Sequence, residues 1–328
     1  MVFQNIDFHN VEEMELTDKG YKMWRLPKSV RDNINERAAN VTSGYSTGVE
    51  LRFKMKGETA DIYLRANEQP EAHVVYIYYG SFQGGWQMSS KVIGTNETRL
   101  TIEAPKNIKR LKETTVENGL AFNPEVVRLV LPYGECFFIK AEGDIEPPAK
   151  EDLPLKTYLA YGSSITHGSL ALAAPYSYPF RIAQKLNCDY INLGLAGTAF
   201  LEPEIAQYIC SRTDWDFASL EMGINLINYM SEEEFEERVK SFISVMATEE
   251  RPVFATSLFG TGQKREKEDM FREIVRKYSE NKFIFTDGLD LLSGARYISQ
   301  DMVHPSLEGV EMIVDRWSEI MRQKLLLK

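Results

Sequence analysis

The sequence is poor in cysteine and histidine and lacks a long hydrophobic run. Three widely spaced cysteines among 328 residues exclude a disulfide framework and a thiolate metal cluster. The four histidines form no His-x-x-x-His pair, and no phosphate-binding Gly-x-x-x-x-Gly-Lys loop occurs, so we predict neither a metal site nor a cofactor. No run of about 18 apolar residues is present, which excludes a helix that spans a membrane.

Basic residues are outnumbered by acidic ones. The chain has 38 Lys and Arg against 48 Asp and Glu, a net charge of −10, which argues against nucleic acid or an anionic membrane as a partner. The first residues have neither a basic nor an apolar stretch of the kind found in signal peptides. We therefore expect a cytoplasmic protein, with secretion left open if a leader has been trimmed, and the sequence leaves its oligomeric state open.

Residues 45–145 have the pattern of an all-β domain. Residues 49–55 alternate apolar and charged side chains, as a half-buried strand does. Gly, Asn and Pro separate this run from further short strand candidates, and no helical pattern lies between them. These candidates are 61–64, 74–79, 99–102, 126–131 and 136–139. The spacing predicts a sandwich or jelly roll.

The pattern changes after a polar, proline-bearing segment at 142–152, which we interpret as a linker. Apolar strands then alternate with amphipathic helices, as in a parallel sheet covered on both faces. We expect strands at 157–161, 190–193, 217–222, 253–257 and 283–286. The predicted architecture is an N-terminal β-sandwich domain at 1–148 and a three-layer α/β/α domain at 149–328.

A serine at the end of the first of these strands is the candidate nucleophile. Ser164 follows the apolar strand in a Gly-Ser-Ser turn, where its hydroxyl would lie above the sheet. An isolated Gly-x-Ser is more often a turn or a helix cap. Far downstream, however, Asp301 stands three residues before His304, so its carboxylate can fold back onto the imidazole. Nucleophile, base and orienting carboxylate are the set that acyl transfer requires.

Two further strands end in candidate hydrogen-bond donors. Gly197 follows one strand and Asn225 follows the next, and open α/β sheets bind ligands at the carboxyl ends of their strands. An oxyanion needs two or three converging donors. We therefore predict an oxyanion hole from the Ser164 N–H, the Gly197 N–H and the Asn225 side-chain amide.

Three other residues call for interpretation. His167 is three residues from Ser164, and we expect it to line the substrate pocket. Trp86 belongs to a run of aromatic residues that offers a face for sugar stacking, although ordinary strand packing is the preferred interpretation. Ser46 lies in a Gly-x-Ser-x-Gly motif, but it precedes a strand instead of following one, so we interpret it as a loop serine.

The blocks around Ser164, Gly197, Asn225 and Asp301–His304 occur in the order typical of one family. From about residue 155 onward the chain resembles the SGNH (GDSL-type) hydrolases, although Ser163 replaces the aspartate of Gly-Asp-Ser. The β-rich half resembles the N-terminal domain of two-domain members, some carbohydrate-esterase-like and some acyltransferase-like. The resemblance implies a Ser164–His304–Asp301 serine esterase that acts on a small O-acyl group of a carbohydrate or similar alcohol. An acyltransferase and a non-catalytic carbohydrate-binding protein are the alternatives.

Overall fold

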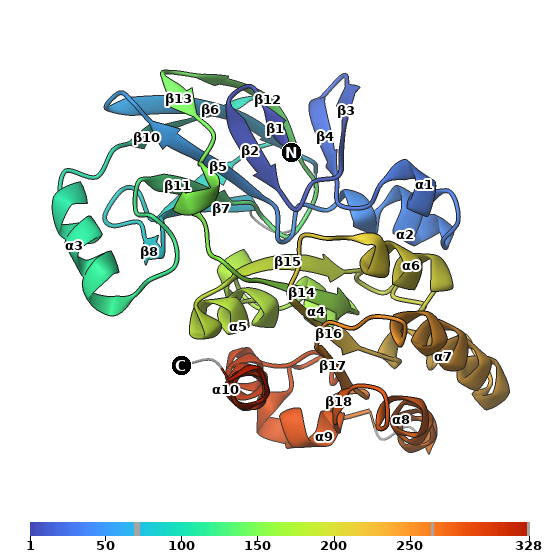
Figure 1. Cartoon of the computed structure of the whole chain (residues 1–328). Helices are drawn as coiled ribbons and strands as arrows, with labels where there is room; N and C mark the ends of the chain where they lie inside the picture. The colour runs from blue at the N-terminus through green and yellow to red at the C-terminus, as the bar shows by residue number, and fades with distance from the viewer. Residues whose placement is uncertain (69–72, 264–265, 327–328) are drawn as a thin grey trace.

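The computed structural model describes residues 1–68, 73–263 and 266–326. The β-rich N-terminal half lies against one side of a C-terminal α/β half, and strand β15 (Asp189–Gly194) is the edge of the α/β sheet nearest to it (Figure 1). The predicted succession of a β-sandwich and a parallel α/β domain is confirmed. Within the described residues, no helix is both long and apolar enough to cross a bilayer.

The N-terminal half contains two sheets of antiparallel strands. One has the order β1-β2-β5-β11-β7-β8, with β13 paired to β5 and β9 paired to β7, and the other has the order β10-β6-β12-β4-β3. The first sheet comprises β1 (Val2–Phe3), β2 (Ile6–His9), β5 (Glu50–Met55), β7 (His73–Tyr79), β8 (Phe82–Gln83), β9 (Ser90–Ile93), β11 (Val126–Val130) and β13 (Ile145–Glu146). The second comprises β3 (Glu13–Thr17), β4 (Gly20–Trp24), β6 (Thr59–Ala66), β10 (Thr98–Glu103) and β12 (Cys136–Glu142).

The C-terminal half has a parallel sheet of order β15-β14-β16-β17-β18. Side chains of β14 alternate between its two faces: Leu159 and Tyr161 join the core under one set of helices, whereas Tyr158 and Ala160 join the core under the other. The remaining strands are β14 (Thr157–Gly162), β16 (Phe217–Glu221), β17 (Val253–Thr256) and β18 (Ile284–Thr286). Helices α6 (Pro203–Ser211), α7 (Glu232–Met246) and α8 (Glu266–Ser279) cover the first face; α5 (Tyr178–Leu186) and α10 (Leu307–Leu325) cover the second.

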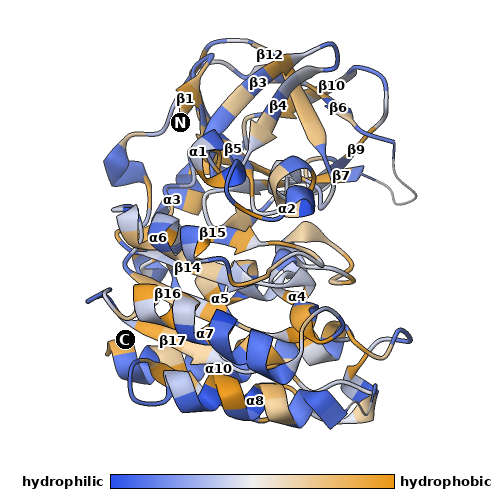
Figure 2. Cartoon of the chain, turned by 90° about the vertical axis from the view of Figure 1, so that its right-hand side faces the viewer, coloured by the Kyte–Doolittle hydropathy of each residue, from blue (hydrophilic) through white to orange (hydrophobic). Residues whose placement is uncertain are grey.

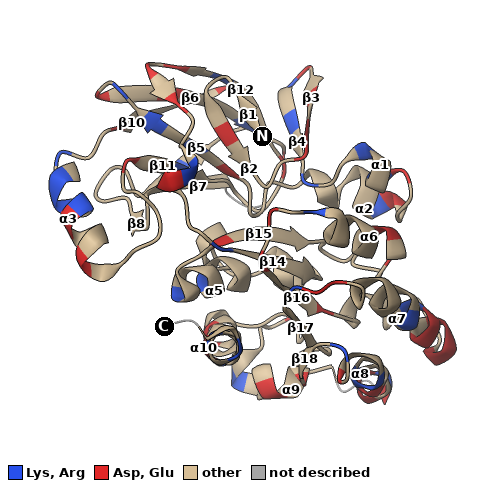
Figure 3. Cartoon of the chain, viewed as in Figure 1, with Lys and Arg blue, Asp and Glu red and all other residues tan. Residues whose placement is uncertain are grey.

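Helix α7 begins as its sequence predicts. Ser231 Oγ accepts the Glu234 N–H at 3.2 Å, and Glu234 Oε2 accepts the Ser231 N–H at 2.7 Å, which completes a capping box. Glutamates fill the first turn, where the helix dipole favours negative charge, and they appear red in Figure 3. The outward side of α7 is hydrophilic (Figure 2), while Phe235, Val239 and Phe242 are buried against the sheet.

Two details of the N-terminal half differ from the sequence interpretation. Helix α3 (Ile108–Asn118) lies between β10 and β11, where no helix was expected. None of its residues is fully buried and Val116 is 82 % exposed, although Leu111 packs against the sandwich core. Its apolar positions are therefore too few to stand out in a periodicity argument. The expected linker is also partly structured, because β13 pairs with β5 and the Asp152 carboxylate lies 2.8 Å from Lys54 Nζ. The predicted boundary between residues 148 and 149 follows β13.

Side chains from the N-terminal half satisfy the free edge of β15. His9 Nε2 lies 2.5 Å from the Tyr190 carbonyl oxygen, and Asn10 Nδ2 donates to the Asn192 carbonyl at 2.9 Å. Arg25 is 1 % exposed and donates to the carbonyls of Asn192 and Gly194 at 2.8 and 3.0 Å. The three carbonyls belong to alternate residues and therefore point to the same edge of the strand. The N-terminal half thus covers an edge that would otherwise leave polar backbone unpaired.

A buried cluster of charges joins the halves beside this edge. Arg52 forms two hydrogen bonds of 2.6 and 2.7 Å with the Asp189 carboxylate and a third of 2.9 Å with Glu50. Arg128 also pairs with both oxygens of Glu50. Burial would raise the pKa of Glu50, but Arg128 and Arg52 outweigh it and lower that pKa to about 2. Burial would also raise the pKa of Asp189, but the Arg52 guanidinium outweighs it and holds that pKa well below its usual range.

These depressed pKa values predict acid sensitivity. A carboxylate whose pKa is lower in the folded than in the unfolded state contributes stability above its unfolded pKa, and that contribution is lost as the pH falls. For Glu50 the loss should extend from pH about 4.5 down to about 2. We expect the urea midpoint to fall steeply over this interval. Glu50→Gln should be less stable than the wild type at neutral pH, because it removes a buried charge. Its urea midpoint should fall less than that of the wild type between pH about 4.5 and about 2. Equal falls in the two proteins would show that Glu50 does not cause the acid sensitivity.

Candidate active site

Ser164 lies at the sharp connection between β14 and the short helix α4 (Ser164–His167). Ser163 is the N-cap, and its hydroxyl accepts the Ile165 N–H at 3.2 Å. As the first helical residue, Ser164 has a backbone N–H without an acceptor inside the helix. Gly162 must be glycine here, because a Cβ atom would lie 2.5 Å from Glu221 Oε2. The turn therefore presents the hydroxyl and the N–H of Ser164 together.

A buried carboxylate that the sequence analysis did not identify supports this turn. Glu221 is 1 % exposed at the end of β16, and its Oε2 accepts the Ser163 N–H at 2.6 Å and the Thr166 hydroxyl at 3.1 Å. Burial raises the pKa of the Glu221 carboxyl, and these hydrogen bonds offset the rise in part. An acidic residue inside an otherwise apolar strand was the available signal.

His304 and Asp301 approach Ser164 from the loop before α10. His304 Nε2 lies 2.7 Å from Ser164 Oγ, and His304 Nδ1 lies 2.5 Å from Asp301 Oδ2. Burial would raise the pKa of Asp301, but hydrogen bonds from the His304 ring and from the Val303 and His304 amides lower it. The carboxylate therefore stays ionised and holds the ring with Nε2 directed at the serine.

Local backbone geometry brings the aspartate to the histidine. Met302 adopts a left-handed conformation with φ of 63°, which reverses the chain between the two residues. Asp301 Oδ1 accepts the Val303 and His304 N–H groups, each at 3.0 Å. The Ser299 N–H donates to the His304 carbonyl at 2.7 Å and closes the loop. The imidazole is therefore held in place before any ligand is bound.

Gly197 and Asn225 occupy the carboxyl ends of the neighbouring strands, as expected. Gly197 has φ of 70° at the third position of a turn that the Thr198 N–H closes onto the Leu195 carbonyl. In such a turn the N–H of the third residue makes no bond within the turn. Asn225 Oδ1 accepts the Ala199 N–H at 3.1 Å, so the NH₂ group of this amide remains as a donor. Both residues thus offer N–H groups at this end of the sheet.

His167 does not lie where the sequence analysis expects it. The side chain is completely buried, with Nδ1 at 2.8 Å from the Gly194 carbonyl oxygen and the ring packed against Tyr45 and Tyr133. Burial, with a contribution from Arg25, lowers the pKa of His167 to about 3. The ring is therefore a neutral, buried structural group at the end of α4, and it does not line the cleft described below.

The other expected residues are distributed as follows. Ser46 is fully buried, and its hydroxyl accepts the Cys136 N–H at 3.1 Å, in agreement with a structural loop serine. Trp86 is 99 % exposed on the connection between β8 and β9 and lines neither of the hollows described below. Its role in substrate binding stays a prediction.

A cleft of about 830 Å³ contains the histidine and aspartate of the site. One wall comes from the N-terminal half, and the other is the loop at 168–174 that follows α4. Tyr133 Oη and Ser169 Oγ, 2.7 Å apart, connect the two walls. The lining residues are Thr47, Val74, Tyr76, Pro132, Tyr133, Gly168–Ala174, Ser299, Gln300, Asp301 and His304.

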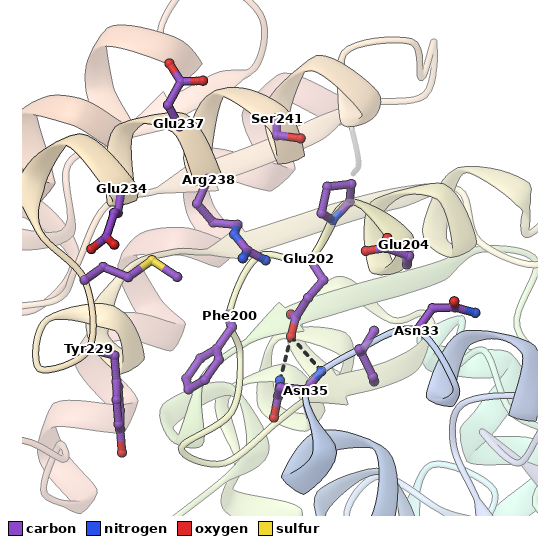
Figure 4. Close-up of a pocket in the computed structure, with 13 residues that line it drawn as sticks. Asn33, Asn35, Phe200, Glu202, Glu204, Tyr229, Glu234, Glu237, Arg238 and Ser241 are labelled. Carbon is purple, nitrogen blue, oxygen red and sulfur yellow. Dashed lines mark hydrogen bonds between the residues drawn. The ribbon is translucent and has the colours of Figure 1, made fainter.

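A second hollow, of about 840 Å³, lies between α6, α7 and the N-terminal segment at 33–35 (Figure 4). Glu202 and Arg238 both point into it, and Glu202 Oε1 accepts two hydrogen bonds from Asn35. Its aromatic pair, Phe200 and Tyr229, has ring centroids 5.4 Å apart. This hollow contains none of the three residues Ser164, Asp301 and His304. Across the described ranges, no three Asp, Glu, His or Cys side chains are grouped to hold a metal ion.

The fold of this chain resembles that of several solved structures. A sequence search of curated proteins finds no match. Among solved structures, the salicylyl-acyltransferase SsfX3 of a tetracycline biosynthetic pathway has a TM-score of 0.78 at 15 % identity, covering 99 % of this chain and 96 % of that one. A family two carbohydrate esterase from Cellvibrio japonicus has a TM-score of 0.62 at 11 % identity, covering 98 % and 95 %. An acetyl xylan esterase from Butyrivibrio proteoclasticus has a TM-score of 0.58 at 13 % identity, covering 100 % and 98 %.

At these identities the structural likeness establishes the shared two-part fold. The family is established by sequence, because the model of the GDSL-like lipase/acylhydrolase family matches residues 155–322. The matched segment extends from the approach to β14 almost to the end of α10 and includes Ser164, Gly197, Asn225, Asp301 and His304. The chain belongs to the GDSL-like lipase/acylhydrolase family.

Proposed function

We propose that this protein is a serine esterase that removes a small acyl group, such as acetyl, from a carbohydrate or a similar alcohol. The observation that carries the proposal is the hydrogen-bonded series from Ser164 Oγ through His304 to Asp301, with distances of 2.7 and 2.5 Å. The names of the carbohydrate esterase and the acetyl xylan esterase support the substrate class by analogy.

In this mechanism Ser164 Oγ attacks the ester carbonyl carbon and transfers its proton to His304 Nε2. The new bond joins Oγ to the acyl carbon, and the bond from that carbon to the alkoxide oxygen breaks as His304 returns the proton to the alkoxide. Asp301 stabilises the imidazolium between these steps. The N–H groups of Ser164 and Gly197 and the Asn225 amide stabilise the oxyanion. Water then attacks the acyl carbon and gives a proton to His304. The bond from that carbon to Ser164 Oγ breaks as His304 returns the proton to Oγ, which releases the acid and restores the serine.

An acyltransferase is the second candidate, since the structural likeness to a salicylyl-acyltransferase extends over nearly the whole chain. It requires only that an alcohol replace water as the second nucleophile, and the same residues serve both reactions. A non-catalytic carbohydrate-binding protein would have no use for a serine placed 2.7 Å from an aspartate-held imidazole.

The test is a panel of acetylated sugars and p-nitrophenyl esters in which both acid release and acyl transfer to an added alcohol are measured. Release of acid as the main product supports the esterase, and predominant transfer supports the acyltransferase. No turnover of any ester by the wild type would contradict both.

Replacing Asn225 should slow the chemical step more than it weakens binding. Asn225→Ala should lower kcat by roughly 10²–10³ with a smaller change in KM, because the amide meets charge that develops only in the transition state. Asn225→Asp is the matched variant, since it keeps an acceptor for the Ala199 N–H and removes the donor. We expect Asn225→Asp to retain more thermal stability than Asn225→Ala without recovering kcat. Recovery of kcat in Asn225→Asp would mean that the residue only supports the loop.

A further inference from the structure

The cleft that contains His304 is formed in part by the N-terminal half, through β7. The side chains of this strand alternate: Val75, Ile77 and Tyr79 enter the sandwich core, whereas Val74 and Tyr76 face the cleft. Tyr76 is half-buried, with one side packed against the core of the α/β half. Its ring is therefore a fixed aromatic surface on the wall opposite the loop that follows Ser164.

The opposite wall is an apolar loop in an unusual conformation. Leu170 and Leu172 have φ values of 59° and 64°, a region that bulky residues seldom adopt, and they are 45 % and 78 % exposed. Surrounding structure must hold such a conformation, and the contact between Ser169 and Tyr133 joins this loop to the N-terminal half. The cleft thus has two largely apolar walls, and its lining also includes Thr47, Ser169 and Ser299. The hydroxyls of these three residues bond to the His167 carbonyl, Tyr133 Oη and the Pro305 carbonyl, and each retains a lone pair that can accept a hydrogen bond.

The chemistry of the triad decides which part of an ester enters this cleft. The leaving alkoxide must receive its proton from His304 Nε2, so its oxygen lies within hydrogen-bond reach of that atom. The carbonyl oxygen points instead toward the donors of Gly197 and Asn225. His304 lines the cleft, whereas Ser164, Gly197 and Asn225 do not. An ester bound at Ser164 would therefore direct its alcohol part past His304 toward the cleft and its acyl part toward the two donors.

We infer that the cleft between Tyr76 and the loop at 168–174 binds the alcohol part of the ester, and that this alcohol is a neutral glycoside. The inference rests on the proposed esterase function. Sugar rings pair an apolar face with a rim of hydroxyls, which matches an aromatic wall beside serine and threonine hydroxyls. The described lining residues include Asp301 but no lysine or arginine, which disfavours a phosphorylated or otherwise anionic alcohol. A volume of about 830 Å³ accommodates such a ring.

The experiment varies the two halves of the ester separately. One ratio compares kcat/KM for an acetylated methyl glycoside with that for ethyl acetate, which changes only the alcohol. The other compares p-nitrophenyl acetate with p-nitrophenyl butyrate, which changes only the acyl group. Each ratio is measured for the wild type, Tyr76→Ala, Tyr76→Phe and Tyr229→Ala. Tyr229 is a matched control because it is a 69 % exposed tyrosine that lines the other hollow.

Tyr76→Ala should lower the first ratio roughly three- to tenfold, the size of effect typical of an aromatic contact, and leave the second unchanged. Both ratios for Tyr76→Phe should stay close to those of the wild type, since this variant keeps the aromatic ring. It therefore shows whether a substitution at this position leaves the protein folded. Tyr229→Ala should leave the first ratio unchanged. A change confined to the second ratio in Tyr76→Ala would overturn the inference and place the acyl group in the cleft.

Binding of unacetylated methyl glycoside, followed by ligand-observed NMR, separates this inference from the proposed function. If the wild type binds the glycoside, Tyr76→Ala does not, and no ester is turned over, the esterase proposal fails while the cleft remains a glycoside site. If esters are hydrolysed but Tyr76→Ala changes neither ratio nor binding, the cleft assignment fails and the esterase stands.

Discussion

Ser164→Ala should abolish turnover while the protein stays folded. Loss of a serine nucleophile from such a triad lowers kcat by up to about 10⁶-fold, because no other group provides the Oγ that His304 contacts at 2.7 Å. The free energy of unfolding should change by less than about 1 kcal/mol, since only one hydroxyl is removed and its partner, the His304 ring, is itself partly exposed to water. Initial rates on p-nitrophenyl acetate and a urea titration measure the two effects.

Ser46→Ala is the matched control, and it should give the opposite pattern. The Ser46 hydroxyl is buried and accepts the Cys136 N–H, so its loss should destabilise the fold by about 1–3 kcal/mol. Turnover below the unfolding transition should be unchanged. A catalytically dead Ser46→Ala protein together with an active Ser164→Ala protein would reverse the assignment of the nucleophile.

Arg52→Met should cause the largest loss of stability. Arg52 is fully buried between the Asp189 and Glu50 carboxylates, and removing one partner of a buried ion pair typically costs about 3–5 kcal/mol. Because Arg52 lies in the N-terminal half and Asp189 begins β15, we expect both halves to unfold in one transition, at a lower urea concentration than in the wild type.

Arg99→Met is the control for this prediction. Arg99 also pairs with an aspartate in the N-terminal half, but its side chain is 59 % exposed. Exposed pairs contribute little, so the urea midpoint should remain close to that of the wild type. Equal shifts for the two arginine variants, or separate transitions for the two halves, would contradict a stabilising interface at β15.

The sequence predicted the elements that repeat a simple pattern. Strands β14 to β17 were recognisable because strands buried on both faces are apolar runs between amphipathic helices. Helix α7 was recognisable from its capping box at Ser231 and Glu234. Helix α3 was missed because none of its residues is fully buried and its apolar positions are few. Patterns along the chain therefore revealed the regularly buried elements, and they did not reveal a mostly exposed helix.

The sequence indicated the residues proposed to carry the chemistry, and it did not indicate the buried residues that hold them in place. Ser164, Asp301 and His304 were singled out by spacing and by family resemblance, and the structure brings them within hydrogen-bond distance. The burial of His167 and the contact of Glu221 with the nucleophile turn depend on neighbours from other strands. Tyr76 lines the cleft because of how the halves pack, and no local pattern in the sequence determines that packing.

Labelling by a fluorophosphonate, a reagent that phosphonylates activated serines, followed by peptide mapping, identifies the nucleophile directly. We expect one label per chain on the peptide that contains Ser164. The label should be absent from Ser164→Ala and strongly reduced in His304→Ala, because only the imidazole activates the hydroxyl. A label on the peptide that contains Ser46, or ester hydrolysis that persists in Ser164→Ala, would show that Ser164 is not the nucleophile.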